Sequence, residues 1–586
     1  MDALLTKTEH KKISPEKSGE KISGSEILLR CLIEEGVDTI FGYPGGAIMP
    51  VYDALYDYAD RLNHILVRHE QGSIHAAQGF ARASGKTGVA LATSGPGALN
   101  LITGLGDALI DSTPVVCITG QVFAHLLGTD AFQEMDVVNT TIPVTKWNAQ
   151  VTEAKDIASV ISKAFYIAKT GRPGPVLVDI TKNAQNEIHE FTGYKKCEGI
   201  RTYKPKPVLP LTEIESAAAL INSATKPYIL AGQGVILSAA TDELIAFSEK
   251  TGIPVACTLL GLGAFPTDHP NYVGLLGMHG NYAPNVLTNE CDVLIAIGMR
   301  FDDRVTGNVS KYAQQANVIH IDIDLAEINK IIQSNVPIHA DAKEALQALI
   351  QLCKPNTHNE WIEKFNSLKK IELEKIVHKE FNPIGKLMMG EVVNRLSALT
   401  NGNAIIVTDV GQHQMITSRY FGYKNPRTNI TSGGAGTMGF ALPAAMGAKM
   451  AMPDQPVIAV MGDGGFQMTI QELGTIMQSK IAVKMIVLNN NFLGMVRQWQ
   501  ELFHNKRYSF TEMHNPDFIK IAEAYSIRAK KISERNELDE AIQEMLNAKD
   551  AYFLEVVVGK EDNVFPMVPA GAGVSEIILE APTKKK

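Results

Sequence analysis

Short apolar runs alternate with longer amphipathic stretches along most of the chain. Apolar runs bounded by turn residues are typical of strands buried in a parallel sheet, and the stretches between them are typical of crossover helices. The pattern therefore predicts an α/β protein with mainly parallel sheets. Strands are predicted at residues 38–42, 64–68, 88–93, 114–119, 227–231, 293–297, 318–323, 404–408, 457–461 and 482–488.

Three α/β regions follow one another, and segments without this alternation separate them. The proline-rich segment 204–210 is typical of a linker. The first residues mix lysine and glutamate without an apolar segment, which predicts a disordered tail. We predict the following division: a tail over 1–22, α/β domains over 23–190, 205–365 and 380–560, and a C-terminal segment over 561–586.

Composition narrows the class of protein. The chain has 586 residues, of which 45% are hydrophobic, and a net charge of −8. This length suggests several domains, and the negative charge gives no patch for nucleic acid. No apolar run is long enough to span a membrane. The six cysteines form no Cys-x-x-Cys pair, and the start of the chain resembles neither a signal nor a transit peptide, so we expect a cytoplasmic protein.

The third region carries a candidate site for a metal ion and a diphosphate. Asp463 lies in Gly-Asp-Gly-Gly after the predicted strand 457–461, and Asn490 follows the strand 482–488. A right-handed crossover makes these strands parallel, so both side chains emerge at the carboxyl edge of the sheet. A carboxylate, an amide oxygen and glycine N–H groups suit Mg²⁺ holding a diphosphate. A simple β-turn would account for Gly-Asp-Gly alone, but the Asn-Asn pair after the next strand favours the cofactor site.

A competing motif lies in the same region. Residues 434–439 fit the Gly-x-Gly-x-x-Gly dinucleotide fingerprint and precede a helix-like stretch, in which Pro443 is tolerable. Asp463 could then serve as the acidic residue beyond the next strand. However, its place inside Gly-Asp-Gly-Gly, together with Asn490, is a metal arrangement that a ribose contact does not explain. We therefore favour the metal site.

With these motifs the chain resembles the large catalytic subunit of acetohydroxyacid synthase (acetolactate synthase), from about residue 23 to about residue 569. The resemblance implies a thiamine diphosphate-binding fold, in which the first domain binds the pyrimidine, the central domain FAD and the third the diphosphate and Mg²⁺. It implies decarboxylation of pyruvate on thiamine diphosphate and transfer of the hydroxyethyl unit to pyruvate or 2-oxobutyrate. That is the first common step of branched-chain amino-acid biosynthesis, which leads to isoleucine and valine.

Glu70 matches the catalytic glutamate of this family. It follows the strand 64–68 in the string His-Glu-Gln-Gly. A thiamine enzyme needs a carboxylate bonded to the aminopyrimidine ring, because this favours the imino form that removes the C2 proton. A glutamate stabilised in the first turn of a helix is the alternative for Glu70 alone. The glycine turn at 93–100 lies near the pyrimidine in the family.

The resemblance also implies the remaining cofactor contacts of the third domain. The metal would be bound by Asp463, Asn490 and the backbone carbonyl of Phe492. A histidine or methionine in such a segment is otherwise most often a packed side chain. The residues implied at the thiamine diphosphate are Gln412, His413, Met438 beneath the bent cofactor, Gly464 and Gly465.

The central region resembles the flavin-binding part of the biosynthetic enzymes. The string Arg-Phe-Asp-Asp-Arg within 298–307 is specific, and catabolic acetolactate synthases without flavin are not expected to carry it. A salt-bridged surface loop is the alternative for any single arginine. The net reaction is redox-neutral, so the flavin would be structural or vestigial. The residues implied at FAD are Arg172, His279, Gly280, Arg300, Asp322 and Asp341.

Five further residues match positions that face the substrate in the family. Phe132 and Gln133 match an active-site segment, and Lys182 matches a lysine of the substrate channel. Arg304 and Trp499 match residues that select the second 2-oxo acid. The chain departs from many relatives at Phe123, where they have proline, and in the glycine stretch that begins at Gly433.

Partners and alternatives follow from the same resemblance. Family members place the glutamate of one subunit against the diphosphate domain of another, which implies a homodimer or homotetramer, and a small regulatory subunit is expected. Neither a nucleic acid nor a membrane is expected as a partner. Another thiamine–flavin enzyme, such as pyruvate oxidase or glyoxylate carboligase, is the alternative, although glyoxylate carboligase lacks the glutamate at Glu70. A catalytically inactive nucleotide-binding module would leave both motifs unused.

Overall fold

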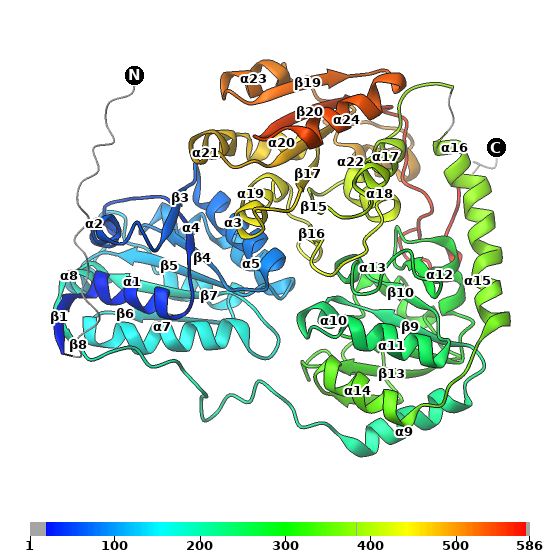
Figure 1. The fold of residues 1–586 in the computed structure, drawn as a ribbon, viewed down its shortest axis with the longest axis horizontal. Helices are drawn as coiled ribbons and strands as arrows, with labels where there is room; N and C mark the ends of the chain where they lie inside the picture. Colours follow the sequence, from blue (N-terminus) through cyan, green and yellow to red (C-terminus); the bar gives the residue numbers. More distant parts are fainter. Residues whose placement is uncertain (1–18, 382–383, 582–586) are drawn as a thin grey trace. The chain divides into compact units, whose positions relative to one another are not determined.

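The fold is built on three six-stranded parallel sheets (Figure 1). A computed structural model describes residues 19–381 and 384–581. The chain divides into two compact units, one made of the residues up to Ala81 with Lys86–Lys204, the other of Arg82–Gly85 and the chain from Pro205 onward. The first unit contains one large sheet and the second contains two. The predicted fold class, three α/β domains with mainly parallel sheets, is confirmed.

The first sheet has the strand order β3-β2-β4-β5-β7-β6. Its interior strands are apolar and buried on both faces, as expected for a parallel sheet covered by helices. The strands are β2 (Thr39–Gly42), β3 (Asn63–Leu66), β4 (Gly88–Ala92), β5 (Val115–Gln121), β6 (Trp147–Val151) and β7 (Val176–Thr181). The helices are α1 (Gly24–Glu34), α2 (Met49–Asp57), α3 (Glu70–Ser84), α4 (Pro96–Leu99), α5 (Ile102–Ile110), α6 (Val137–Thr141), α7 (Ala154–Lys169) and α8 (Lys182–Asn186).

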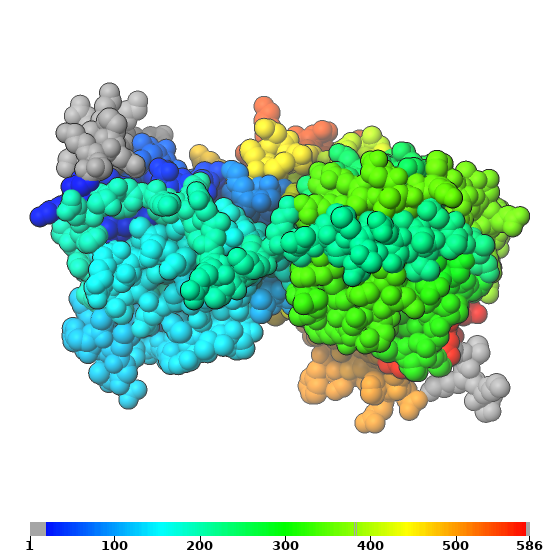
Figure 2. Space-filling view, turned by 90° about the horizontal axis from the view of Figure 1, so that it is seen from below, coloured from blue at the N-terminus to red at the C-terminus, as the bar shows by residue number. Residues whose placement is uncertain are grey.

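The central sheet has the order β11-β10-β9-β12-β13-β14. Its strands are β9 (Pro227–Ala231), β10 (Val255–Cys257), β11 (Tyr272–Leu275), β12 (Val293–Ile297), β13 (Asn317–Asp322) and β14 (Val336–His339). Its helices are α9 (Leu211–Ser223), α10 (Gln233–Leu237), α11 (Thr241–Thr251), α12 (Tyr282–Thr288), α13 (Asp303–Thr306), α14 (Ala342–Leu352), α15 (Asn359–Glu372) and α16 (His378–Glu380). Figure 2 shows α9 and the segment before it, in blue-green, lying over the green helices of this domain, where Lys206 forms an ion pair with Glu344.

The third sheet has the order β16-β15-β17-β18-β20-β19. Its strands are β15 (Ile405–Thr408), β16 (Asn429–Thr431), β17 (Val457–Gly462), β18 (Lys484–Asn489), β19 (Arg528–Ile532) and β20 (Tyr552–Val557). Its helices are α17 (Met389–Thr400), α18 (Gln412–Tyr420), α19 (Ala441–Ala451), α20 (Asp463–Met468), α21 (Leu473–Ser479), α22 (Gly494–Phe503), α23 (Phe518–Ala524) and α24 (Leu538–Asn547).

The strand orders place the candidate sites. In each sheet, the strand that comes first in the chain has two neighbours. The second strand of the chain pairs on one of its sides, and a later strand pairs on its other side. The reversal falls between β2 and β4, between β9 and β12, and between β15 and β17. Open α/β sheets bind ligands in the crevice outside the carboxyl ends of the strands at such a reversal. Each of the three sheets therefore offers one ligand-binding edge.

The chain termini differ in part from the prediction. Residues 1–18 of the predicted tail lie outside the described residues. The prediction of disorder is wrong for Glu20–Ile22, because β1 (Glu20–Ser23) pairs antiparallel with β8 (Ile188–Phe191) and buries Ile22. At the other end, the backbone N–H of Val568 donates to the carbonyl of Met278 at 2.8 Å, so the C-terminal segment contacts the central domain. Across the described ranges, no helix is long and apolar enough to cross a membrane.

Candidate active site

Asp463 and Asn490 lie at the carboxyl ends of neighbouring parallel strands. Gly462 at the end of β17 pairs with Leu488 near the end of β18, so the two loops begin side by side. Asp463 is the first residue of α20. Both side chains are buried, with 2% and 4% exposed surface. The sheet thus presents a carboxylate and an amide oxygen at one point of its edge.

Asn515 connects the two loops. Its Nδ2 donates to Oδ2 of Asp463 at 2.6 Å and to Oδ1 of Asn489 at 3.0 Å. Its Oδ1 accepts a hydrogen bond from Nε2 of Gln467 at 2.9 Å. No local motif in the sequence marks Asn515 or Gln467 as part of this site. Together they fix the orientation of the Asp463 carboxylate.

The donor set fits Mg²⁺ held jointly with phosphate oxygens. Burial raises the pKa of Asp463 to about 6, and hydrogen bonds from Asn515 and neighbouring backbone amides offset this shift only in part. Oδ1 of Asn490 accepts a hydrogen bond from the backbone N–H of Phe492 at 3.0 Å, and its second lone pair remains for a metal ion. In the described part of the chain, no cluster of three or more His, Cys, Asp or Glu side chains is placed to hold a metal. A cation at Asp463 therefore needs amide, carbonyl and ligand oxygens, as Mg²⁺ on a diphosphate does.

His413 lies next to the Asp463 turn with an unused ring nitrogen. A Cβ on Gly462 would lie 2.9 Å from Nδ1 of His413, so the glycine allows the ring to pack there. Burial lowers the pKa of His413 to about 4, although a hydrogen bond to the Asp409 backbone opposes the shift. Its Nε2 is buried and has no hydrogen-bond partner among the described residues. An orphaned buried polar atom indicates a place for a polar ligand.

Gln412 and Met438 approach the same loops. Nδ2 of Asn490 donates to Oε1 of Gln412 at 3.5 Å, and Nε2 of Gln412 donates to Oε1 of Gln498 at 3.1 Å. Cε of Met438 is 3.7 Å from where a Cβ on Gly464 would lie. The structure therefore brings together the residues predicted at the diphosphate and the metal.

The contacts of Asp409 bear on whether the motif at 434–439 binds a dinucleotide. Its fully buried carboxylate accepts the backbone N–H groups of Gly439 at 3.0 Å and of Ala441 at 3.3 Å. Burial raises its pKa to about 6. A protein carboxylate thus occupies the N-terminus of α19, where a dinucleotide would place its pyrophosphate. This geometry disfavours a dinucleotide at that motif.

Glu70 lies at the carboxyl edge of the first sheet. It begins α3 and is buried, with 8% exposed surface. Nδ2 of Asn100 donates to its Oε2 at 2.8 Å, and its Oε1 is 3.2 Å from where a Cβ on Gly97 would lie. The glycine turn at 93–100 therefore holds the carboxylate through one neutral donor. Such a group can exchange a proton with a ligand.

The predicted substrate-facing residues of the first unit, Phe132, Gln133 and Lys182, follow β5 and β7 at the same edge. Phe132 follows β5 and is 87% exposed. Gln133 has φ of 59°, and its carbonyl oxygen is 2.8 Å from where a Cβ on Gly95 would lie. Lys182 follows β7, with its Nζ 5.9 Å from the ring centroid of Phe123. The residue that replaces proline thus contacts the predicted channel lysine.

The residues predicted at FAD follow different strands of the central sheet. His279 and Gly280 come after β11, and Arg300 comes after β12. Asp322 ends β13, and Asp341 follows β14. Since all these strands are parallel, the five residues share one carboxyl edge.

Two glycines outside any predicted motif, Gly232 and Gly234, meet Gly298 of the 298–307 segment at the centre of this edge. Side-chain atoms on Gly232 or Gly234 would clash with Gly298, across the reversal between β9 and β12. The backbone N–H of Gly234 donates to the carbonyl of Gly298 at 2.8 Å. Such a close backbone approach at a reversal point is typical of dinucleotide sites, and strand–glycine–helix spacing was the available signal.

His279 supplies the second observation in favour of a ligand here. Its Nδ1 is buried without a hydrogen-bond partner among the described residues. Burial first, and then the charges of Arg419 and Arg304, lower its pKa to about 4. Arg304 itself is exposed and contacts Met278, with its Nη1 3.5 Å from the sulfur. These features fit FAD.

Some residues predicted at the flavin already have partners in the protein. Asp341 caps α14 by accepting the backbone N–H of Lys343 at 2.9 Å. Oδ1 of Asp322 accepts the backbone N–H of Asp324 at 2.8 Å. Arg172 belongs to the first unit, where its Nε donates to Oγ of Ser112 at 2.9 Å. Nη2 of Arg300 lies 3.9 Å from Oδ2 of Asp302.

Trp499 lies on α22, which begins just after the Asn490 loop. Its ring packs against Phe503, with the centroids 4.9 Å apart. Trp499 is half-buried, and Phe503 is exposed. The indole therefore forms part of a helix surface and is not enclosed in a core.

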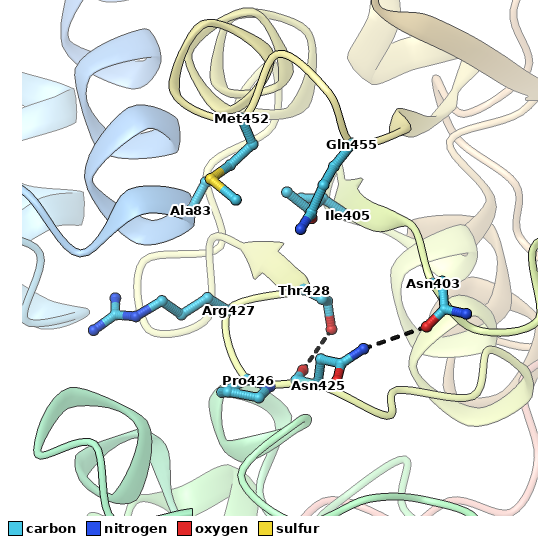
Figure 3. A pocket seen from close by; sticks show the side chains of 9 residues that line it. All are labelled: Ala83, Asn403, Ile405, Asn425, Pro426, Arg427, Thr428, Met452 and Gln455. Carbon is cyan, nitrogen blue, oxygen red and sulfur yellow. Dashed lines mark hydrogen bonds between the residues drawn. The ribbon is translucent and has the colours of Figure 1, made fainter.

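A cavity of about 300 Å³ lies at the opposite end of the third sheet (Figure 3). Its lining includes Ile405 and Thr428, at the amino ends of β15 and β16. Asn425 donates through Nδ2 to Oδ1 of Asn403 at 3.4 Å and accepts through its carbonyl from Oγ1 of Thr428 at 2.7 Å. Because the candidate ligands lie at the carboxyl ends, this cavity is separate from the candidate active site.

Three family models match successive parts of the chain. The thiamine pyrophosphate enzyme N-terminal TPP binding domain matches residues 22–140. The central domain of these enzymes matches 214–349, and their C-terminal TPP binding domain matches 409–556. Each match contains one of the three large sheets or most of it.

Several curated proteins are similar over nearly the whole chain. The acetolactate synthase isozyme 2 large subunit of Escherichia coli (strain K12) is 44% identical over 558 residues, 95% of this chain and 99% of that protein. The acetolactate synthase large subunit of Lactococcus lactis is 44% identical over 571 residues, 97% of each chain. The probable acetolactate synthase large subunit of Methanocaldococcus jannaschii is 46% identical over 572 residues, 95% of each chain.

Proposed function

The chain belongs to the family of acetolactate synthase large subunits, and from this membership and its site we propose that it is the catalytic subunit of such an enzyme. It condenses two pyruvate molecules into 2-acetolactate with release of one CO₂. With 2-oxobutyrate as the acceptor, the product is 2-aceto-2-hydroxybutyrate. These are the first common steps toward valine and isoleucine.

The observation that carries this proposal is the cluster at the carboxyl ends of β17 and β18. Asp463 and Asn490 supply the protein oxygens for Mg²⁺, and the backbone carbonyl of Phe492 supplies a third. His413 and Gln412 hold the diphosphate, and His413 does so through Nε2, for which the described part of the chain supplies no partner. Thiamine diphosphate, when bound, supplies the electron sink that stabilises a carbanion after decarboxylation.

Glu70 moves the proton. Its carboxylate would hold the aminopyrimidine ring of the cofactor and would give or take a proton there, while Asn100 holds Oε2. General acid–base groups of this kind accelerate a step by about 10²–10⁴-fold. Burial of Glu70 limits competition from water for the same proton.

The substrate carboxylates and the acceptor side chain need separate groups. Lys182 and Arg304 supply positive charge for carboxylates, and the planar guanidinium of Arg304 can bind one through two hydrogen bonds. Trp499 offers an apolar face for the extra methylene of 2-oxobutyrate. Phe132 and Gln133 lie in the loop beside Glu70 and contact the pyruvate.

FAD is proposed as a structural cofactor of the central domain. The strand order, the glycine approach at Gly232 and Gly298, and the unpartnered Nδ1 of His279 support this assignment. His279, Gly280, Arg300, Asp322 and Asp341 border the proposed site. The net reaction transfers no electrons, so the flavin does not need to change its redox state.

We further propose a small regulatory subunit as partner, a homodimer or homotetramer of this chain, and a cytoplasmic location. The relatives are called large subunits, which supports a smaller partner chain. Five of the six cysteines, Cys117, Cys197, Cys257, Cys291 and Cys353, are free thiols, as is typical of proteins in a reducing compartment. Size-exclusion chromatography with light scattering measures the assembly directly.

One experiment tests the central proposal against its alternatives. The purified protein is titrated with thiamine diphosphate with and without Mg²⁺, and is then given pyruvate while acetolactate, acetyl phosphate and CO₂ are measured. Metal-dependent cofactor binding and acetolactate formation are expected. Oxygen consumption with acetyl phosphate would indicate a pyruvate oxidase, and condensation of glyoxylate alone would indicate a glyoxylate carboligase. Binding without turnover would leave an inactive module.

A further inference from the structure

We propose that Asn515 determines which divalent cation the site accepts, because it prevents Asp463 from binding a metal through both carboxylate oxygens. The inference rests on the proposed metal and thiamine diphosphate site, and it adds a specificity-determining residue outside the ligands themselves. Asn515 lies 52 positions after Asp463, in the segment that follows α22.

The amide of Asn515 faces a group of oxygen atoms. Its Nδ2 lies 2.6 Å from Oδ2 of Asp463, 3.0 Å from Oδ1 of Asn489 and 3.1 Å from Oδ1 of Asn491. A side-chain amide has two hydrogens, so both are engaged by this group. The shortest of the three bonds goes to the charged oxygen, as expected for a charge-assisted hydrogen bond.

Gln467 fixes which end of the amide points at Asp463. Nε2 of Gln467 donates to Oδ1 of Asn515 at 2.9 Å and to the backbone carbonyl of Asp463 at 3.0 Å. A rotated amide would place Oδ1 of Asn515 against the three oxygens and its Nδ2 against the donor of Gln467. The nitrogen therefore stays on Oδ2 of Asp463.

The backbone around Asn515 is tied to the loop of the other metal ligands. The N–H of Met513 donates to the carbonyl of Asn491 at 2.8 Å, and the N–H of Leu493 donates to the carbonyl of Thr511 at 2.8 Å. Phe492 and Glu512 form a β-bridge between the same two segments. Asn515 thus moves with the Asn490 loop and holds Asp463 at a fixed position relative to it.

The consequence is a carboxylate whose two oxygens differ. Oδ2 shares its charge with the Nδ2–H group of Asn515, which makes it the poorer metal ligand of the two, and Oδ1 is the oxygen offered to the metal. Mg²⁺ requires a nearly regular octahedron of six ligands, which a carboxylate bound through one oxygen suits. Ca²⁺ takes six to eight ligands in flexible geometry and often binds carboxylates through both oxygens. Holding Oδ2 in a hydrogen bond therefore favours the smaller cation.

The test compares Mg²⁺ and Ca²⁺ affinities by calorimetry on the full-length protein with thiamine diphosphate in excess. Asn515→Ala frees Oδ2 of Asp463, and the ratio of Mg²⁺ to Ca²⁺ affinity is expected to fall by about tenfold, the effect of one hydrogen bond to a charged group. His514→Ala is the matched control, since His514 is the exposed neighbour of Asn515 and its variant should keep the wild-type ratio.

Each outcome decides the proposal. An unchanged ratio in a folded Asn515→Ala protein would overturn it, as would an equal fall in the His514→Ala control. If thermal melts show that Asn515→Ala does not fold, the ratio of Mg²⁺ to Ca²⁺ affinity is measured in Gln467→Leu instead, because this change removes the hydrogen bond that orients the Asn515 amide. An unchanged ratio in Gln467→Leu also overturns the proposed role. A wild-type protein that binds no thiamine diphosphate with either metal would instead refute the proposed function.

Discussion

The first and third domains share one strand order and carry different chemistry at the same edge. Counted from the first strand of each large sheet, both follow 2-1-3-4-6-5, whereas the central sheet follows 3-2-1-4-5-6. The first domain places a single carboxylate, Glu70, beside one amide donor. The third places Asp463 within a set of amide side chains, next to a ring nitrogen of His413 that has no hydrogen-bond partner among the described residues. The scaffold is the same, and the loops after its strands decide the function.

The two carboxylates are prepared for different tasks. Glu70 has one described side-chain partner, the neutral Asn100, which donates to its Oε2. Asp463 is oriented by Asn515 and lies in a loop that Gln467 also supports, so its position is fixed. A movable proton suits acid–base chemistry and a fixed oxygen suits a metal ion. We therefore expect changes in the first domain to alter turnover and changes in the third to alter cofactor affinity.

The largest effect is expected for Glu70→Gln. The amide keeps the shape of the side chain but cannot share a proton with the aminopyrimidine, so kcat should fall by about 10²–10⁴-fold while thiamine diphosphate still binds. Exchange of the cofactor C2 proton, followed by NMR, is the direct measurement. A wild-type exchange rate in Glu70→Gln would remove the catalytic role and with it the contrast between the two edges.

Asp463→Ala should show the opposite pattern. It removes the one charged protein ligand proposed for Mg²⁺, and even groups that only support a metal ligand typically contribute 10–100-fold to affinity. The affinity for magnesium and thiamine diphosphate should therefore fall by more than about 100-fold, as measured by calorimetry. The far-UV circular dichroism spectrum should be unchanged. Unaltered metal-dependent binding would show that the metal lies elsewhere.

Two glycine substitutions sharpen the comparison with smaller changes. A Cβ on Gly97 would lie 3.2 Å from Oε1 of Glu70, and a Cβ on Gly465 would lie 2.6 Å from Oδ1 of Asp409. Overpacking of this kind typically costs about 1–3 kcal/mol. Gly97→Ala should lower kcat at saturating cofactor, whereas Gly465→Ala should mainly raise the cofactor concentration needed for half-maximal activity. The same kinetic pattern in both variants would argue against separate roles for the edges.

The comparison also shows what the sequence could predict. The strands predicted at 227–231 and 293–297 agree with β9 and β12 to the residue, because buried parallel strands are continuous apolar runs between polar turns. Asp463 and Asn490 could be placed at one edge because both follow such strands. The shared strand order of the first and third domains could not be read, since hydrogen bonding between strands, and not local pattern, determines it.

Other features depend on partners that are distant in the chain. Asn515 contacts Asp463 across 52 positions, and its local sequence, His-Asn-Pro, carries no signal for a metal site. Strand β1 forms because β8, far along the chain, supplies its hydrogen bonds. Helix α20 begins at Asp463 although Gly464 and Gly465 disfavour a helix interior, because at a first turn their small size admits Asp409 and Met438. Local sequence carries none of this information.

The smallest effect is expected at Trp499, in the acceptor half of the reaction. Pyruvate and 2-oxobutyrate differ by one methylene, which a hydrophobic surface distinguishes by about 1–3 kcal/mol. Trp499→Leu keeps an apolar side chain but loses most of the flat surface that packs on Phe503, so the preference for 2-oxobutyrate should fall by about 1 kcal/mol while acetolactate is still formed.

Competition between the two oxo acids, with both products measured, is the test of Trp499→Leu, and Arg304→Lys is the matched comparison. Both acceptors carry the carboxylate that Arg304 is proposed to bind, so its loss should weaken them equally and leave the product ratio unchanged. Thermal melts separate recognition from packing, because a purely structural Trp499 would lower Tm without altering the ratio. A stable Trp499→Leu protein with the wild-type product ratio would show that the third domain provides cofactor affinity alone. The choice of acceptor would then have to depend on other residues, and those beside Glu70 and Lys182 would be the first to examine.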